Sequence, residues 1–162
     1  MRISIVISYY NRRNLFIKTL ESIVKTKFKG DFEIIVVDDA SIESHRIDDL
    51  TSMFSKLNLK IVRVEPEDKW WVNPCIPNNI GFEISSGEII IIQNPECLHM
   101  GDIVDYVAKN VIDNRYIVFG CYAINNDKTQ LINRVNGGAT DGILKIISPI
   151  SNLPLDTFPG SN

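Results

Sequence analysis

Short apolar runs alternate with stretches of helical period along most of the chain. β-branched residues dominate the apolar runs, which is typical of strands buried on both faces. The predicted strands are 3–8, 33–37, 60–64, 88–93 and 116–123. Between them, apolar residues recur at spacings of three and four, which predicts helices around 16–24, 47–57 and 104–111. This alternation indicates an α/β fold with an open, mostly parallel sheet and helices on both faces.

The connections that follow the strands are the expected ligand-binding region, because open α/β sheets bind ligands beyond the carboxyl ends of their strands. These connections are predicted at 9–14, 38–43, 65–79 and 94–101. Asn11 or Asn14 is expected to cap the first helix, and Gly30 and Gly87 fall where helices are expected to end. Near the C-terminus, an Asn-Asn-Asp-Lys turn predicts a short antiparallel addition.

Composition narrows the classes of function. The 162 residues are 44% hydrophobic and 23% charged, which is ordinary for one globular domain. A net charge of -3 with scattered Lys and Arg argues against nucleic acid as a partner. Short apolar runs and the lack of a signal-peptide layout predict a cytoplasmic protein without a transmembrane segment, with peripheral membrane contact left open. The widely spaced Cys75, Cys97 and Cys121 predict reduced thiols in or near the core.

The first connection, SYYNRRN, lacks glycine. Dinucleotide folds and P-loops need glycines there so that the backbone can approach phosphates, which disfavours dehydrogenase and ATPase functions. The hydroxyls of Ser8 and Tyr10 and the amide of Asn11 suit a nucleobase or a sugar. The alternative is that one tyrosine packs under the sheet and Asn11 only caps the helix.

Two adjacent carboxylates, Asp38 and Asp39, end the second predicted strand. Side chains alternate along a strand, so the two should point to different sides and only one should face a ligand. A carboxylate can accept the imide N–H of uracil while the base stacks on Tyr10, which leaves Asp38 to hold the loop. Alternatively, either aspartate caps the next helix.

Asn94 and Glu96 follow four consecutive isoleucines, and Pro95 fixes the backbone between them. Side chains two residues apart lean the same way. Their oxygens suit a hard divalent cation that bridges the two phosphates of a nucleotide. The alternative is that Asn-Pro is only a turn signal.

Two neighbouring features are ambiguous. His99 either joins the cation or the diphosphate, or is an ordinary loop residue. Trp70 and Trp71 either form an aromatic wall beside a sugar ring or seal their connection onto the core.

Three stretches between residues 3 and 102 together resemble a known family: ISIVISYYNRRNLFIKTLESI, FEIIVVDDAS and PNNIGFEISSGEIIIIQNPE. Their order and separation resemble the nucleotide-sugar-binding half of inverting glycosyltransferases of family 2, which have the GT-A fold. The resemblance implies that Ser8 and Tyr10 line the base pocket and that Asp39, supported by Asp38, meets uracil or another base.

The third connection departs from the family pattern. The resemblance places Asn78 and Asn79 at the Arg-Asn of an Arg-Asn-x-Gly motif and implies that they bind the nucleotide. Asn78 donates a hydrogen bond but carries no charge. A diphosphate should therefore bind more weakly unless Arg12, Arg13 or Lys69 compensates.

The metal-binding D-x-D motif of the family is Asn-Pro-Glu in this chain. The resemblance implies that Glu96 is the ligand of Mn²⁺ or Mg²⁺. Asn94 retains a carbonyl oxygen for the ribose or a metal-bound water, and the loss of one carboxylate should weaken cation binding.

The resemblance implies a hexosyltransferase that moves a sugar, with inversion and cation assistance, from a nucleotide-diphosphate donor to a hydroxyl on a glycan or another acceptor. UDP is the favoured nucleotide. The general base is unassigned, because Asp127, Asp141 and Asp156 belong to no recognisable motif. Residues 1–162 are expected to form one nucleotide-sugar-binding domain, either truncated or the donor-binding part of a longer enzyme. The alternative is a catalytically incomplete GT-A-like module that binds a nucleotide or a partner chain.

Overall fold

The computed structural model describes residues 1–111 and 116–119. Every described residue belongs to one compact unit, Met1–Cys121. The predicted antiparallel addition and the three candidate base aspartates lie outside the described residues. Within the described part of the chain, no helix has the length and apolar character that crossing a bilayer requires.

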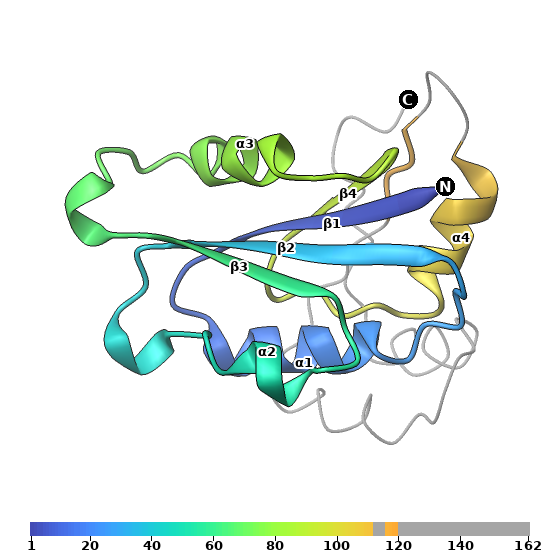
Figure 1. Cartoon of the computed structure of the whole chain (residues 1–162), viewed down its shortest axis with the longest axis horizontal. Helices are drawn as coiled ribbons and strands as arrows, with labels where there is room; N and C mark the ends of the chain where they lie inside the picture. The colour runs from blue at the N-terminus through green and yellow to red at the C-terminus, as the bar shows by residue number, and fades with distance from the viewer. Residues whose placement is uncertain (112–115, 120–162) are drawn as a thin grey trace, which may run out of the picture. The chain divides into compact units, whose positions relative to one another are not determined.

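The sheet has four parallel strands in the order β3-β2-β1-β4. The strands are β1 (Arg2–Tyr9), β2 (Asp31–Asp39), β3 (Leu59–Val64) and β4 (Ile89–Gln93). The register pairs Tyr9 with Asp38 and Ile7 with Gln93, so β1, β2 and β4 end near one edge of the sheet (Figure 1). The predicted open, parallel α/β sheet is confirmed.

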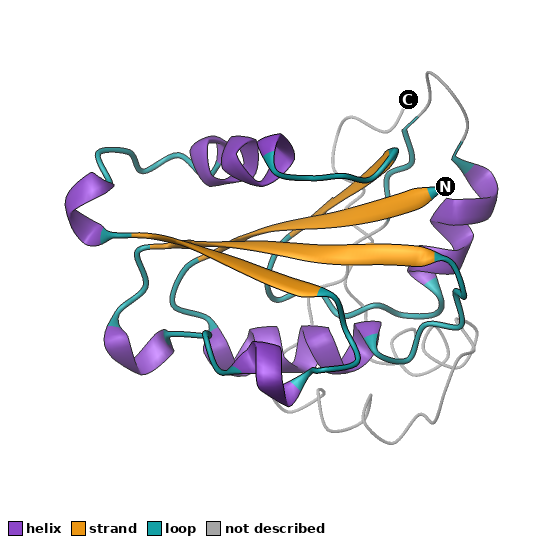
Figure 2. Ribbon diagram, viewed as in Figure 1, coloured by secondary structure: helices purple, strands orange, loops and turns teal. Residues whose placement is uncertain are grey.

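Helices cover both faces of the sheet. Figure 2 shows α1 (Arg13–Ile23) and α2 (Leu50–Met53) on one face and α3 (Cys75–Glu83) on the other. The predicted apolar stripe of α1 turns Phe16 and Leu20 into the core, where both side chains are fully buried. Burying a side chain of this size contributes roughly 1.5–3 kcal/mol relative to leaving it exposed.

The second predicted helix, over 47–57, is wrong in length, because α2 has only 4 residues. Ile47 and Leu57 are both buried, but they reach the core from the turns before and after α2. The three- and four-residue spacing therefore reflects burial on one side of the segment, which turns can produce as well as a helix.

α3 begins inside the stretch 65–79, which was predicted to be a connection. Pro77 suggests a helix break, but it is the third residue of α3, where a backbone N–H would have no intrahelical acceptor. Cys75, predicted in or near the core, is exposed at the first position of the helix. A Cβ on Gly81 would lie 2.5 Å from Val6 Cγ1, so glycine here lets α3 approach the sheet closely.

The predicted helix ends are also wrong at two glycines. α1 ends at Ile23 and α3 at Glu83, so neither Gly30 nor Gly87 ends a helix. A Cβ on Gly87 would lie 2.5 Å from the backbone nitrogen of Ser4, so this glycine permits a close approach of two chain segments.

The segment 116–119 forms no strand, contrary to the predicted strand 116–123. Phe119 packs its ring edge-on against Tyr106 of α4 (Ile103–Asn110), with 5.8 Å between the ring centroids. Phe119 therefore packs against a helix, whereas Tyr116 and Val118 are exposed. α4 itself confirms the third predicted helix.

Candidate functional site

A hollow of about 450 Å³ is lined by residues from the carboxyl ends of β1 and β2 and from the connections that follow β1, β3 and β4. Five residues predicted to bind the donor or its cation line this hollow: Ser8, Tyr10, Asp39, Asn94 and Glu96. Arg12, Lys69 and Trp71 line it as well. The structure therefore brings together side chains from the loops that the sequence singles out.

The two tyrosines of the first connection have different environments. Tyr9 ends β1 fully buried, and its hydroxyl donates to the His45 carbonyl oxygen at 2.6 Å. Burial raises the pKa of Tyr9 to about 12. Tyr10 is 49% exposed and lines the hollow. One tyrosine is thus packed against the fold, and the other presents its ring where a ligand can reach it.

Asn11 links the first two connections instead of capping α1. Its backbone φ of 51° lies in the left-handed region, which asparagine tolerates. Its N–H donates to Ser41 Oγ at 3.0 Å, and its Oδ1 accepts from the N–H of Ile42 at 3.0 Å. The predicted cap by Asn11 or Asn14 is wrong, because Arg12 holds the N-cap position without a side-chain cap bond.

Asp38 holds the second connection, as predicted. Its side chain is 2% exposed. Its Oδ1 accepts from the N–H of Ser41 at 3.0 Å, and its Oδ2 accepts from Arg63 Nη1 at 2.9 Å. Arg63 also donates to the Ser41 carbonyl oxygen at 3.1 Å. Asp38 is therefore committed to the fold, which leaves the hollow to Asp39.

Asp39 receives two donors in a nearly buried position. Lys69 Nζ lies 2.9 Å from its Oδ2, Trp71 Nε1 donates to its Oδ1 at 2.9 Å, and the side chain is 8% exposed. A carboxylate offers about four acceptor positions, so these two donors leave acceptor capacity on each oxygen. Asp38 and Asp39 contact different groups, as expected for side chains that alternate along a strand.

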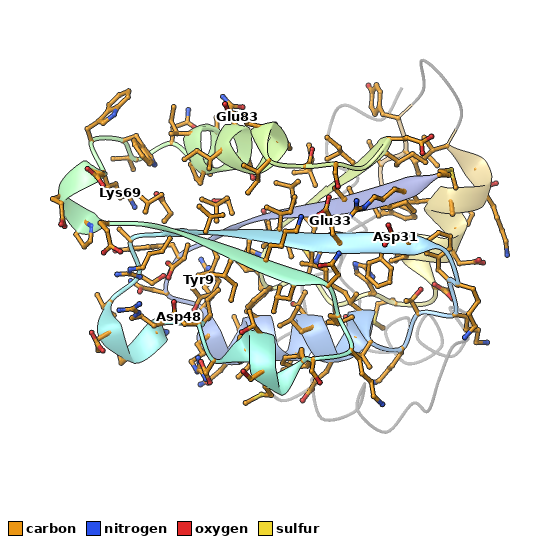
Figure 3. All side chains as sticks on the ribbon, in the orientation of Figure 1. Tyr9, Asp31, Glu33, Asp48, Lys69 and Glu83 are labelled. Carbon is orange, nitrogen blue, oxygen red and sulfur yellow. The ribbon has the colours of Figure 1, made fainter. Side chains whose placement is uncertain are left out.

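Lys69 connects the acid and the aromatic ring of the hollow. Its Nζ lies 4.4 Å from the centroid of the Tyr10 ring and donates to the backbone carbonyl oxygen of Asp39 at 3.0 Å. Both contacts suit an ammonium, since a ring face and a carbonyl oxygen each present negative charge. Figure 3 shows Lys69 beyond the strand ends, at the connection that follows β3. The sequence indicates Lys69 only as a substitute for the missing arginine.

The two tryptophans differ in their contacts, and Trp70 fits neither of the two predicted roles. Trp71 anchors its connection to Asp39 and lines the hollow. Trp70 is 82% exposed, and its ring meets the Trp71 ring edge-on with 5.6 Å between centroids. Sequence reasoning missed the hydrogen bond from Trp71, because it joins positions 32 residues apart.

Glu96 has a charged neighbour across the first connection. Arg12 Nε lies 3.7 Å from Glu96 Oε2, and the two side chains are 52% and 36% exposed. Exposed ion pairs contribute about 0–1 kcal/mol, so a ligand can separate this pair at little cost. Thr19 Oγ1 of α1 donates to the Pro95 carbonyl oxygen at 2.8 Å and fixes the backbone beside Glu96.

The donor set fits a cation that a nucleotide helps to hold. Glu96 supplies one carboxylate and Asn94 one amide oxygen at the hollow. Among the described residues, no three His, Cys, Asp or Glu side chains gather as a metal cage. Mg²⁺ is commonly bound by one or two carboxylates together with substrate phosphates, which is the arrangement this set can provide.

Three residues predicted to bind the nucleotide or the cation do not line the hollow. Asn78 and Asn79 belong to α3 and are not among the described residues that line the hollow. His99 does not line it either. Its Nε2 lies 2.6 Å from Gln93 Oε1, and burial lowers its pKa to about 4, so the ring is neutral near pH 7.

Two of the three cations suggested to replace the missing arginine are placed to do so. Arg13 is not, because its guanidinium donates to both carboxylate oxygens of Asp49 at 2.7 and 2.6 Å. Arg12 and Lys69 line the hollow.

This parallel α/β sheet, with a polar hollow at its strand ends, matches solved glycosyltransferase domains of the GT-A class. The crystal structure of Staphylococcus aureus TarS aligns with a TM-score of 0.57 at 26% identity, covering 67% of this chain and 19% of that chain. Residues 4–156 match the sequence profile of glycosyl transferase family 2. The chain belongs to this family.

Further comparisons give the same picture. TarS 1-349, solved in complex with UDP, aligns with a TM-score of 0.55 at 21% identity, covering 74% of this chain and 39% of that chain. A mannosyltransferase from Pyrobaculum calidifontis, solved in complex with GDP-Man and Mn²⁺, aligns with a TM-score of 0.53 at 21% identity, covering 65% of this chain and 32% of that chain. The poly(ribitol-phosphate) beta-glucosyltransferase of Bacillus spizizenii is 38% identical over 116 residues, 69% of this chain and 16% of that protein. The chain spans about a fifth of the length of the curated relatives it matches.

Proposed function

We propose that the chain binds the nucleotide-diphosphate sugar donor of an inverting glycosyltransferase, with a UDP-hexose as the favoured donor. The sugar is transferred to a hydroxyl on a glycan or another acceptor. The observation that carries this proposal is the meeting of Tyr10, Asp39 and Glu96 around one hollow from three separate connections. Membership of glycosyl transferase family 2 supports the reaction class.

The base side of the hollow suits uracil. Tyr10 presents an exposed ring for stacking, and Asp39 retains acceptor capacity for the imide N–H. The indole of Trp71 keeps the carboxylate oriented. UDP in the complex with TarS, a protein of the same fold, supports this class of ligand.

The phosphate side of the hollow suits a diphosphate with a divalent cation. Glu96 would hold Mn²⁺ or Mg²⁺, with the Asn94 carbonyl oxygen beside it. When bound, such a cation supplies positive charge that stabilises the departing diphosphate. The guanidinium of Arg12 adds charge beside Glu96. Mn²⁺ in the mannosyltransferase complex supports this choice of ion.

Inversion by direct displacement also requires a base within about 3 Å of the acceptor hydroxyl, to take its proton as the oxygen attacks the anomeric carbon. We assign no described residue to this role. The proposal gives residues 1–162 the donor-binding role as one domain, alone or within a longer enzyme. The cytoplasmic location stays a prediction.

Calorimetric titration of UDP into the 162-residue chain, with and without Mn²⁺, tests the proposal. We expect UDP to bind, more tightly when Mn²⁺ is present. Glu96→Gln should remove the effect of Mn²⁺. Glu83→Gln, an exposed carboxylate on α3, is the matched control and should retain the effect. If the intact chain binds no UDP in either condition, the donor-binding function is wrong.

A second candidate is a catalytically incomplete module that binds a nucleotide or a partner chain. Two observations favour it: Asn94 stands where the family pattern has an acid, and Glu96 already has Arg12 beside it. The test is whether the chain transfers sugar and whether Glu96→Ala, shown to be folded by circular dichroism, abolishes the transfer. Both results together would count decisively against this candidate.

A further inference from the structure

We infer that, before the donor binds, the Lys69 ammonium occupies the nucleobase position of the hollow and that donor binding moves it to the diphosphate. The inference rests on the proposed function. It assigns Lys69 two successive partners, first Asp39 with Tyr10 and then phosphate oxygens.

The first step of the argument is that Lys69 and a base compete for the same groups. The ammonium lies 2.9 Å from Asp39 Oδ2 and 4.4 Å from the centroid of the Tyr10 ring. A bound uracil would use the same acid for its imide N–H and the same ring for stacking. Asp39 has acceptor capacity for both, so the competition arises at the ring: an ammonium 4.4 Å from the centroid occupies one face of Tyr10, and a base stacked on that face and Lys69 exclude each other.

The second step is that Asp39 can lose Lys69 without being left alone. Trp71 donates to Oδ1, and Lys69 contacts Oδ2. When Lys69 withdraws from the ring, the imide N–H can take its place at Oδ2 while Trp71 still orients the carboxylate. The base therefore replaces one donor on a nearly buried acid by another, and no buried carboxylate is left without a partner.

The third step is that the diphosphate needs a cation that Lys69 can supply once it leaves Asp39. The arginine of the family pattern is Asn78 here, and Asn78 does not line the hollow. Arg13 is held by Asp49 and Arg63 by Asp38. Among the described residues, Arg12 and Lys69 are the cations that line the hollow. A lysine carries its charge on a flexible four-carbon stem, so it can change partners inside one hollow.

One consequence separates this inference from an ordinary structural lysine. A nucleoside has to displace Lys69 but offers the ammonium no phosphate. UDP also displaces Lys69, but its phosphate oxygens then bind the ammonium. Lys69 should therefore oppose uridine and favour UDP. A lysine that only stabilises the loop would affect both ligands in the same direction.

The test is a titration of uridine, UMP and UDP into the 162-residue chain and its Lys69→Met variant, followed by NMR. We expect Lys69→Met to bind uridine at least roughly threefold more tightly and UDP at least roughly threefold more weakly, since each exchanged contact is a modest one. UMP should fall between them. Lys56→Met, which removes an exposed lysine outside the hollow, should match the wild-type protein.

A second measurement uses the wild-type protein and does not depend on the folding of a variant. The ε-methylene protons of Lys69 should resonate upfield because they lie near the face of Tyr10. We expect saturating UDP to abolish this shift, and inorganic pyrophosphate alone to reduce it.

The outcomes separate the two proposals. If wild-type protein binds no UDP, both are overturned. If UDP binds, but Lys69→Met changes uridine and UDP affinity in the same direction, or the upfield signal persists at saturation, only the inference about Lys69 is overturned.

Discussion

At the scale of single residues, the Trp71 indole has a defined task in the hollow. Its N–H donates to Asp39 Oδ1 at 2.9 Å, and this is the donor that stays if Lys69 leaves. A hydrogen bond to a charged group contributes about 1.5–3 kcal/mol. Substitution of Trp71 should therefore weaken UDP binding more than substitution of Trp70.

We expect Trp71→Phe to weaken UDP binding roughly tenfold or more, because an aromatic ring remains but the donor to Asp39 is lost. Isothermal titration measures the change. Trp70→Phe is the matched control, since Trp70 is 82% exposed and should leave the affinity unchanged. Equal affinities for the two variants would contradict this role of Trp71.

Glu33 on β2 is a fully buried carboxylate outside the hollow. Burial would raise its pKa, but the Lys60 ammonium at 2.7 Å and the hydroxyls of Ser86 at 2.6 Å and Ser4 at 2.7 Å lower it to about 2. The pKa in the folded state lies below the ordinary value of 4.5. The ionised form therefore stabilises the fold above pH 4.5, and this contribution is lost as the pH falls towards about 2.

Glu33→Gln should flatten the dependence of the urea midpoint on pH between 4.5 and about 2, because the group that takes up the proton is gone. It should also destabilise the protein at neutral pH by about 1–3 kcal/mol, since the Ser4 and Ser86 donors lose their charged acceptor. Asp31→Asn, an exposed carboxylate on the same strand, is the control and should keep the wild-type slope. An unchanged slope in Glu33→Gln would show that other groups dominate acid unfolding.

At the scale of secondary-structure elements, α3 is held close to β1 by the absence of a side chain at Gly81. We expect Gly81→Ala to destabilise the unit by about 1–3 kcal/mol, because the new Cβ would lie 2.5 Å from Val6 Cγ1 and overpack the contact. Urea unfolding measures the loss.

The double variant Gly81→Ala with Val6→Ala tests the stated cause. Removing the valine methyl groups should make the added Cβ harmless, so the two changes should be clearly non-additive. Additive losses would mean that the clash is not with Val6.

The elements of the sheet could be predicted from sequence, and the helices only in part. Buried parallel strands have a strong local signal of consecutive β-branched residues, which located all four described strands. The bounds of α3 are wrong in the sequence prediction, because Pro77 signals a break unless the helix start is known and Gly87 signals an end that comes earlier, at Glu83. The segment 116–119 shows the reverse error, since an apolar run has the same local pattern whether it pairs as a strand or, as here, leaves Tyr116 and Val118 exposed and packs Phe119 on α4.

At the scale of the whole described unit, the place of the hollow could be predicted but not all of its contacts. Parallel topology brings strand ends to one edge, so Tyr10, Asp39 and Glu96 meet without any knowledge of their rotamers. Lys69 and Trp71 reach Asp39 across about thirty residues of chain, and no local pattern specifies such pairings.

UDP should stabilise the unit as a whole if the proposed function is correct. At a concentration one hundred times Kd, a ligand that binds only the folded state raises the free energy of unfolding by about 2.7 kcal/mol. Urea unfolding with and without UDP measures this increase. Asp39→Asn should lose most of it, whereas Glu83→Gln should retain it. A wild-type transition that UDP does not move would contradict the proposal.

The bridge that Asn11 makes to Ser41 and Ile42 has a consequence for engineering. It fastens residues 10–12 to residues 41–42. The aromatic side of the hollow and the turn after Asp39 therefore depend on each other for their conformation. Grafting a first connection from another family member onto this scaffold, in order to change the accepted donor, would require transplanting both segments together.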